Sequence, residues 1–154
     1  MVVLMVKKFY NRRLMDSIIV DVSEPLDKTI RRLYKNPRLK GVFLVTPENK
    51  LYGTVTRHDL LGFLRTQLGS SPWSTDKIVA ILKKAQAKEV VHKFSYAASL
   101  TPETSIDEAL KAMVMLDLVD MPVVDKQRKI IGEITLTMIL SGMLQASRNK
   151  KARK

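Results

Sequence analysis

The sequence contains no cysteine and few aromatic residues: one Trp, four Tyr and four Phe. The lack of cysteine excludes disulfides and thiolate metal sites, and two histidines, His58 and His92, do not make a metal-ligand cluster. No apolar run approaches the roughly 18–20 residues that a membrane-spanning helix needs. The opening MVVLMV lacks the charged start and the cleavage site of a signal peptide. We therefore expect a soluble, cytoplasmic protein with no metal and no transmembrane segment.

Acidic residues are scarce relative to basic ones, with 15 Asp+Glu against 27 Lys+Arg and a net charge of +12. Five of the positive charges lie in the stretch RNKKARK, residues 148–154, which has no apolar residue beyond Ala152 and is predicted to be disordered. The remaining excess indicates a surface that attracts nucleic acid, anionic lipid or phosphorylated ligands, or one that only keeps the protein soluble.

Signatures of catalysis are also absent from the sequence. It has no nucleophile–base–acid set, no glycine-rich P-loop with a lysine, and no pair of carboxylates expected in one cleft. The methionines have the spacing of core residues rather than of a metal site. We therefore predict that the protein is not an enzyme.

What the sequence does contain is an internal repeat. The phrases YGTVTRHDLL and IGEITLTMIL lie 79 residues apart within the longer similar stretches 42–64 and 121–144. Each stretch holds an apolar run, a polar turn, a second apolar run and a helical pattern. The matched positions are Gly53 with Gly132, Thr56 with Thr135, and Asp59 with Met138.

The similarity continues upstream, where each hairpin is preceded by an amphipathic helix that begins after a polar cluster. The predicted apolar faces are Leu26, Ile30, Leu33 and Tyr34 in the first copy and Ile106, Ala109, Leu110 and Met113 in the second. Each copy therefore reads strand, helix, strand, strand, helix. A copy of about 60 residues buries little core alone. We predict an α+β fold in which two βαββα repeats pack through three-stranded sheets with pseudo-twofold symmetry.

These patterns divide the chain into four segments. Residues 1–69 form the first copy with an N-terminal extension, an extra strand or helix docked on one copy, and residues 96–146 form the second copy. Between them, residues 70–95 form a helical connector whose helix is capped by Ser74 or Thr75 and anchored to the core by Trp73. Residues 147–154 form the basic, disordered tail.

This organisation resembles a tandem pair of CBS (cystathionine-β-synthase) domains, also called a Bateman module. The resemblance covers roughly residues 16–144 and rests on GTVTRHD, residues 53–59, and DMPVVDKQRKIIGEIT, residues 120–135. It implies a regulatory module that binds AMP, ADP, ATP or S-adenosylmethionine and senses it for a separate partner protein. It also implies a homodimer and energy sensing.

The motif GTVTRHD has two physical interpretations. Thr56 and Asp59 have the spacing of a helix cap, in which the threonine accepts from the third N–H and the acid complements the helix dipole. They also suit an adenosine ligand, because a helix N-terminus attracts phosphate and a carboxylate accepts hydrogen bonds from ribose hydroxyls. Thr54 and Thr56 are expected on one side of the strand, with Val55 in the core. In the family, the cap residues also bind the ligand.

The resemblance extends the candidate site to other segments. Phe43 departs from the proline usual in the family, which the second copy keeps at Pro122, and a core role suits Phe43 better than base stacking. Because Met138 replaces the acid, we expect one strong site, with at most a weaker second one. The candidate ligand-binding residues of the first copy are Asp21, Val22, Ser23, Pro25, Lys40, Gly41, Val42, Phe43, Thr54, Thr56, Arg57, His58 and Asp59. Those of the weaker second site are Thr101, Asp120, Met121, Pro122, Thr135 and Thr137.

Two functions remain open from the sequence. The first is a stand-alone nucleotide-sensing module, favoured by the Thr and Asp set of the first copy. The second is a nucleic-acid-binding or scaffold protein that keeps the fold without the ligand, favoured by the net charge. The small number of aromatic residues available to stack on bases counts against the second.

Overall fold

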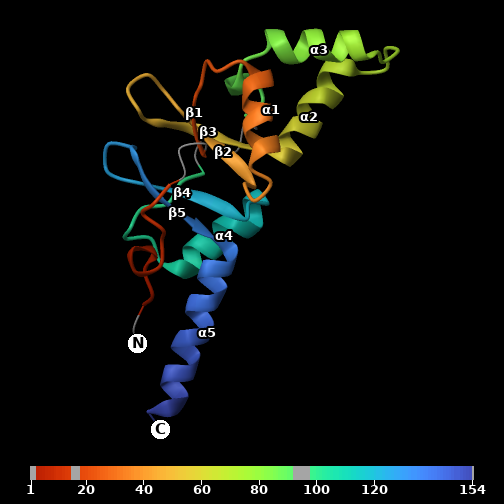
Figure 1. Ribbon diagram of the computed structural model, residues 1–154. Helices are drawn as coiled ribbons and strands as arrows, with labels where there is room; N and C mark the ends of the chain where they lie inside the picture. The colour runs from red at the N-terminus through yellow and green to blue at the C-terminus, as the bar shows by residue number, and fades with distance from the viewer. Residues whose placement is uncertain (1–2, 15–17, 92–97, 154) are drawn as a thin grey trace. The chain divides into compact units, whose positions relative to one another are not determined.

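The chain forms two compact units in a computed structural model that describes residues 3–14, 18–91 and 98–153 (Figure 1). Residues 15–97 make up the first-copy unit, and residues 1–14 together with 98–154 make up the second-copy unit. Both contain helices and strands, which confirms the predicted α+β class. The packing of the two units through their sheets stays a prediction.

The first-copy unit contains the predicted strand–helix–strand–strand–helix series. Its elements are β1 (Ile19–Asp21), α1 (Leu26–Lys35), β2 (Gly41–Val45), β3 (Leu51–Thr56) and α2 (Arg57–Leu68), followed by α3 (Thr75–Lys84) and the short 3-10 helix η3 (Ala87–Glu89). The sheet has the order β1-β2-β3, with β1 parallel and β3 antiparallel to β2. A parallel neighbour requires a crossover, and α1 supplies it.

Helix α1 buries one face, as its apolar spacing predicts. Leu26, Thr29 and Leu33 are buried. Tyr34 was predicted on the same face, but 84% of its surface is exposed, so this assignment was wrong. At 100° per residue, Tyr34 follows Leu33 around the helix and away from the buried stripe.

The second-copy unit repeats this series with a reduced first strand. Its elements are the 3-10 helix η1 (Val6–Lys8), α4 (Ile106–Leu116), β4 (Asp120–Val124), β5 (Ile130–Thr135) and α5 (Leu136–Ala152). Strands β4 and β5 form an antiparallel pair, and Leu100 adds one parallel bridge to Val123. The prediction of a third full strand in this sheet was therefore wrong for the described residues.

The N-terminal extension belongs to the second-copy unit, not to the first copy as the boundary 1–69 implied. Val6 is fully buried in the second-copy core, and its N–H donates to the Thr104 carbonyl oxygen at 2.8 Å. Further along, the Asn11 and Glu133 backbones exchange hydrogen bonds of 2.8 and 2.9 Å. The extension thus supplies backbone partners to β5 and an apolar side chain to a core that one short repeat fills poorly.

The predicted connector helix is present as α3, with Ser74 as its N-cap. Trp73 does not anchor it, because 65% of the Trp73 surface is exposed. None of the α3 residues is buried. Helix α3 lies in the first-copy unit, beside α1 and α2 (Figure 1). Residues 92–95 of the predicted connector lie outside the described residues.

The predicted disordered tail is wrong for residues 147–152, which continue α5. Once a helix has formed, adding a residue costs far less than nucleating a new helix. Positive side chains near the C-terminal end also interact favourably with the helix dipole. Lys150 and Lys151 lie in this last turn.

Close packing of the N-terminal extension on Gly132 makes a testable prediction. A Cβ at Gly132 would lie 2.4 Å from the Asn11 carbonyl oxygen and 2.5 Å from the Tyr10 ring. Gly132→Ala should therefore destabilise the protein by about 1–3 kcal/mol, as overpacking does. Denaturant unfolding measures this.

The matched control is Gly62→Ala in α2, where a Cβ would meet no atom within 4 Å. Alanine has the higher helix propensity, so this variant should be more stable than the wild type by about 0.5–1 kcal/mol. Equal effects of the two substitutions would contradict the docking of the extension.

Candidate functional site

The junction of β3 and α2 carries the most complete set of predicted site residues. Thr56 ends the strand and caps the helix, and its hydroxyl oxygen accepts from the Asp59 N–H at 3.2 Å. In return, Asp59 Oδ2 accepts from the Thr56 N–H at 2.8 Å and from the Thr56 hydroxyl at 2.9 Å. This reciprocal pair is a capping box. The helix-cap interpretation of the GTVTRHD motif is therefore confirmed.

The capping box does not use all of the Asp59 carboxylate. The hydrogen bonds that its side chain accepts go to Oδ2, and Oδ1 makes no hydrogen bond to any residue that the structure describes. The residue is only partly buried. An ionised carboxylate is an acceptor with room for several hydrogen bonds. Asp59 can therefore cap the helix and still accept hydrogen bonds from a ligand.

The two basic residues of the first turn have different surroundings. Arg57 donates from one guanidinium nitrogen to the carbonyl oxygens of Leu33 and Leu39, at 3.1 and 3.0 Å. That nitrogen holds the chain between α1 and β2, so the predicted role of Arg57 toward a phosphate competes with a structural one. His58 is exposed and lines a cavity.

Gly41 lies at the same edge of the sheet because it pairs with Thr56. A Cβ on Gly41 would lie 2.4 Å from the Val55 carbonyl oxygen, so this close approach of β2 and β3 requires glycine. Exposed Lys40 precedes it. Gly41, Lys40, Thr56 and Asp59 thus lie together where β2 begins and α2 begins.

Three predicted residues of this region are core residues instead. Val42 and Phe43 are buried in β2, in agreement with the core role preferred for Phe43. Val55 is fully buried as predicted, but Thr54 is also buried, with 3% of its surface exposed. Thr54 shares its strand face with half-buried Tyr52 and Thr56 but is itself covered, so alternation does not place its hydroxyl on an open surface.

The predicted residues that follow β1 lie at the opposite edge of the sheet. Asp21 pairs with Val45, whereas Thr56 pairs with Gly41, at the other end of β2. Four residues of strand separate the two edges by about 13 Å. Within the first-copy unit, Asp21, Val22, Ser23 and Pro25 are therefore not assembled with Asp59, which corrects the predicted site. The start of β1, at Ile19, is the end nearer to Gly41.

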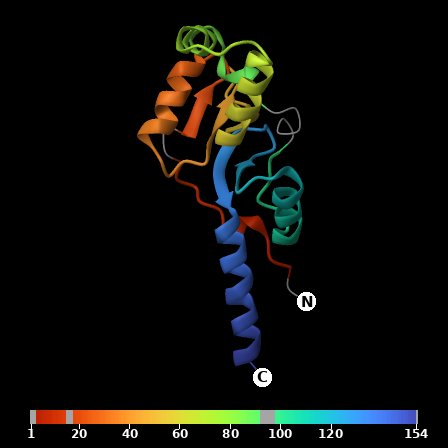
Figure 2. The same cartoon turned by 90° about the vertical axis from the view of Figure 1, so that its right-hand side faces the viewer.

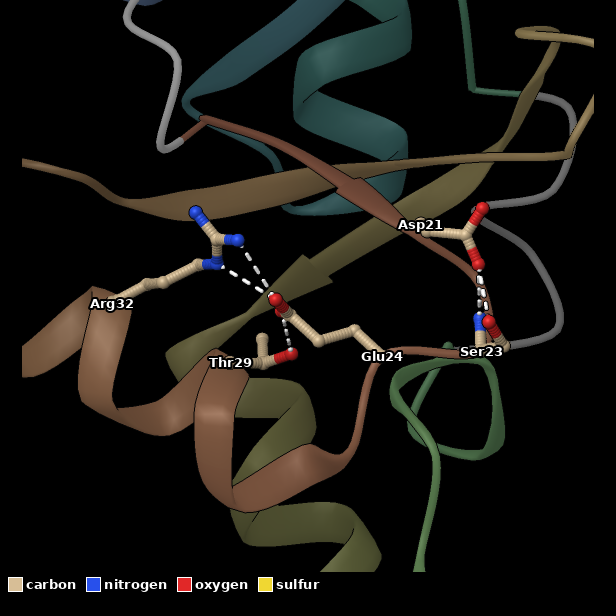
Figure 3. Close-up of polar contacts among 5 residues, drawn as sticks. All are labelled: Asp21, Ser23, Glu24, Thr29 and Arg32. Atoms are coloured by element: carbon tan, nitrogen blue, oxygen red, sulfur yellow. Dashed lines mark hydrogen bonds and ion pairs between the residues drawn. The ribbon is translucent and has the colours of Figure 1, made fainter.

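The turn after β1 instead has a structural network that the sequence analysis missed (Figure 3). Glu24 is buried and accepts from the Thr29 hydroxyl at 2.7 Å and from Arg32 Nε at 2.9 Å. Arg32 also forms an ion pair with it at 2.8 Å. Hydrogen bonds from the Ser23 hydroxyl and N–H hold the pKa of exposed Asp21 below its ordinary value. The only sequence signal was an acid directly before the proline at the N-cap position of α1.

One cavity of about 840 Å³ lies along α2, the end of η3 and the two residues that follow it. Of the predicted site residues, only His58 and Asp59 line it. Its other lining residues are Gly62, Phe63, Arg65, Thr66, Gln67, Glu89, Val90 and Val91. The cavity therefore runs from the capping box along α2 to the end of η3, where the Ala87 and Lys88 N–H groups donate to the Glu24 and Val22 carbonyl oxygens of the β1 turn.

The second copy has two carboxyl groups at the corresponding edge. Asp120 takes the place of Gly41, and Glu133 that of Thr54, on adjacent strands. The Oδ1 atom of Asp120 is buried without a hydrogen-bond partner among the described residues. Burial, reinforced by the nearby Glu133 carboxylate, raises the pKa of Asp120 to about 8. Burial also raises the pKa of Glu133. Asp120 was predicted as a site residue, but its pairing with Glu133 was not, because only the strand register brings the two carboxyl groups together.

The remaining second-copy candidates do not form one group. Thr135 caps α5, accepts from the Met138 N–H at 3.3 Å, and lies 3.2 Å from the Thr137 hydroxyl. Met121 and Pro122 are buried in β4. Thr101 follows Leu100, which pairs with Val123, so it lies toward the other edge of the sheet and was wrongly grouped with Thr135.

Neither a metal-ligand cluster nor a membrane-spanning helix is found among the described residues. In residues 3–14, 18–91 and 98–153, no three His, Cys, Asp or Glu side chains gather as metal ligands. None of the helices in these ranges is both long and apolar enough to span a membrane.

The raised pKa of Asp120 predicts a pH-dependent stability. The folded protein keeps a proton that the unfolded chain releases near the ordinary Asp value of about 4. The stability from this group is complete below that pH and is lost as the pH rises toward about 8. The melting temperature should therefore fall between pH 5 and pH 8, roughly the interval between these two pKa values, and Asp120→Asn should flatten this fall.

Asp117→Asn is the matched control. Asp117 is exposed and has left-handed backbone, which asparagine also adopts. This variant should keep the pH dependence of the wild type, as measured by thermal unfolding. The same slope in both variants would refute the role of Asp120.

Comparison with known proteins supports the two-copy architecture. The CBS domain family model matches residues 6–66 and 87–145. The chain is 27% identical over 147 residues to CBSX1, a chloroplastic CBS domain-containing protein of Arabidopsis thaliana, covering 87% of this chain. It spans 62% of the length of that curated relative.

Solved structures agree on the fold. The structure of CBSX2 in complex with AMP has a TM-score of 0.69 at 19% identity, over 94% of this chain and 98% of that chain. A CBS domain-containing protein of Thermotoga maritima has a TM-score of 0.70 at 22% identity, over 92% of this chain and 95% of that chain. Two matched copies, each with a hairpin followed by a threonine-capped helix, show that this chain belongs to the CBS domain family.

Proposed function

We propose that the protein is a regulatory CBS module that binds an adenine nucleotide at the edge where β2 and α2 begin and senses it for a partner protein. The observation that carries this proposal is the Asp59 carboxylate, which caps α2 through Oδ2 and leaves Oδ1 for a ligand. The related protein CBSX2 forms a complex with AMP, which supports the choice of ligand.

The charge of this edge favours a phosphorylated ligand. The α2 N-terminus carries partial positive charge and backbone N–H groups, and exposed Lys40 and His58 lie beside it. Asp59 would accept hydrogen bonds from the ribose hydroxyls. S-adenosylmethionine carries a sulfonium cation in place of phosphate, so we expect it to bind more weakly than AMP, ADP or ATP.

The second copy suits a phosphorylated ligand less well. Met138 cannot accept hydrogen bonds from ribose, although Thr135 keeps the cap. The carboxyl groups of Asp120 and Glu133 stand where the first copy has Gly41 and Thr54. When ionised, they repel phosphate. We therefore expect one strong site per chain.

Titration calorimetry with AMP on the wild type and on Asp59→Ala tests the proposal. Loss of charge-assisted hydrogen bonds costs about 1.5–3 kcal/mol, which weakens binding roughly 10- to 100-fold. The stability lost with the cap should be only about 1 kcal/mol. The wild type should bind about one AMP per chain.

Glu108→Ala is a matched control, because Glu108 completes the equivalent capping box with Ser105 at the start of α4. It should cost similar stability and leave AMP affinity unchanged. Equal affinity of the wild type and Asp59→Ala, or two equivalent sites, would refute the assignment. Tighter binding of S-adenosylmethionine would correct the ligand.

Homodimer formation is part of the same proposal. Leu61 in α2 and Leu140 in α5 occupy corresponding positions of the two copies, and both are exposed, by 58% and 41%. Apolar side chains that recur at one helical position suit a shared interface.

The predicted cytoplasmic location stays a prediction.

Sedimentation velocity tests the dimer. The wild type should sediment as a dimer, and the double variant Leu61→Glu with Leu140→Glu as a monomer, because buried unpaired carboxylates are costly. A charge-matched variant, Ser70→Glu with Ser141→Glu, places two exposed carboxylates elsewhere and should keep the dimer. A wild-type monomer at high concentration would exclude the dimer without affecting the ligand site.

A further inference from the structure

The last turns of α5 are exposed to solvent. Ile139 and Gly142 are buried, but all described residues from Ser147 to Arg153 are exposed. Figures 1 and 2 show α5 continuing past β4, β5 and α4. Apart from Ala152, the side chains of this segment are polar or charged, so what it presents to solvent is mainly its charge.

That charge is of one sign only. Arg148, Lys150, Lys151 and Arg153, here called the α5 basic end, carry it, and α5 contains no Asp or Glu at any position. At 100° per residue, the four cations spread around the whole helix axis. None of them pairs with a carboxylate among the described residues. Cations three residues apart repel each other along a helix, and a polyanion would relieve that repulsion.

The fold adds a second pair of cations from the other end of the sequence. Lys7 and Lys8 are exposed on η1. The next residue, Phe9, packs on α5, because a Cβ at Gly142 would lie 2.7 Å from its ring. Residues more than 130 positions apart in the sequence are thereby held in one unit, on and beside the same helix.

The distribution of charge selects the kind of partner. A helix that lies on a membrane needs an apolar face opposite its basic one, and the α5 basic end has cations on all sides. A nucleic acid instead presents a dense series of phosphates that lysine and arginine neutralise without reading bases. We propose that the α5 basic end, together with Lys7 and Lys8, binds the phosphate backbone of nucleic acid independently of base sequence.

Fluorescence anisotropy tests this with a uridine RNA of about 20 nucleotides and a mixed-sequence DNA duplex of similar length, from about 50 to 200 mM KCl. Each phosphate contact contributes about 0.7–0.9 to the slope of log affinity against log salt. The variant R148Q/K150Q/K151Q/R153Q should bind more weakly and lower that slope by about 3. K7Q/K8Q should lower it by about 1.5.

The control K77Q/K83Q/K84Q/K88Q removes the same net charge from the first-copy unit. It should keep a slope near that of the wild type. Glutamine is a good helix former, and circular dichroism verifies that each variant folds. AMP titration of the α5 variant should be unchanged, which separates this proposal from the nucleotide site.

Three results would overturn the proposal. The first is an equal loss of slope in the α5 variant and in the control, which would reduce the effect to net charge. The second is a wild type that binds neither RNA nor DNA. The third is binding only to vesicles that contain phosphatidylserine, which would make the partner an anionic membrane.

Discussion

The threonine that ends each hairpin and caps the following helix is the interaction on which both units depend. Thr56 and Thr135 each pair with the first residue of the preceding strand, Gly41 or Asp120. The same threonines then accept from the third N–H of α2 or α5. A helix whose first turn is bonded to a strand end has a fixed starting point. Whatever lies in that first turn is therefore held at the edge of the sheet.

The two copies keep this junction and differ in what it presents. In the first copy, an acid completes the capping box, and a glycine opens the facing strand. In the second copy, Met138 replaces the acid, and the carboxyl groups of Asp120 on β4 and Glu133 on β5 lie at the same edge. One carboxyl is buried enough to retain its proton near neutral pH. The same backbone arrangement thus presents different groups in the two copies. The edge in the first copy suits a phosphorylated ligand, and the edge in the second copy holds a carboxyl group that keeps its proton.

The N-terminal extension shows how a small unit compensates for its size. The second-copy sheet has two strands and one parallel bridge, less than its counterpart. Residues 3–14 add backbone hydrogen bonds to β5 and bury Val6 in the core. Gly132 and Gly142 provide the close approach that this docking requires. The same docking brings basic residues from both ends of the sequence onto one unit.

The sequence by itself determined the repeat, the α+β class, the family, and the threonine caps, because apolar periodicity and capping depend on residues close together in the chain. Only the tertiary structure decided which residues share a site. Asp21 and Asp59 were predicted to share one ligand site, yet strand register places them at opposite edges of the sheet. Strand register also brings Asp120 and Glu133 together. The N-terminal extension packs on the second copy and not on the first. Local sequence does not encode these outcomes, because pairing partners far apart in the chain are selected by the core that they bury together.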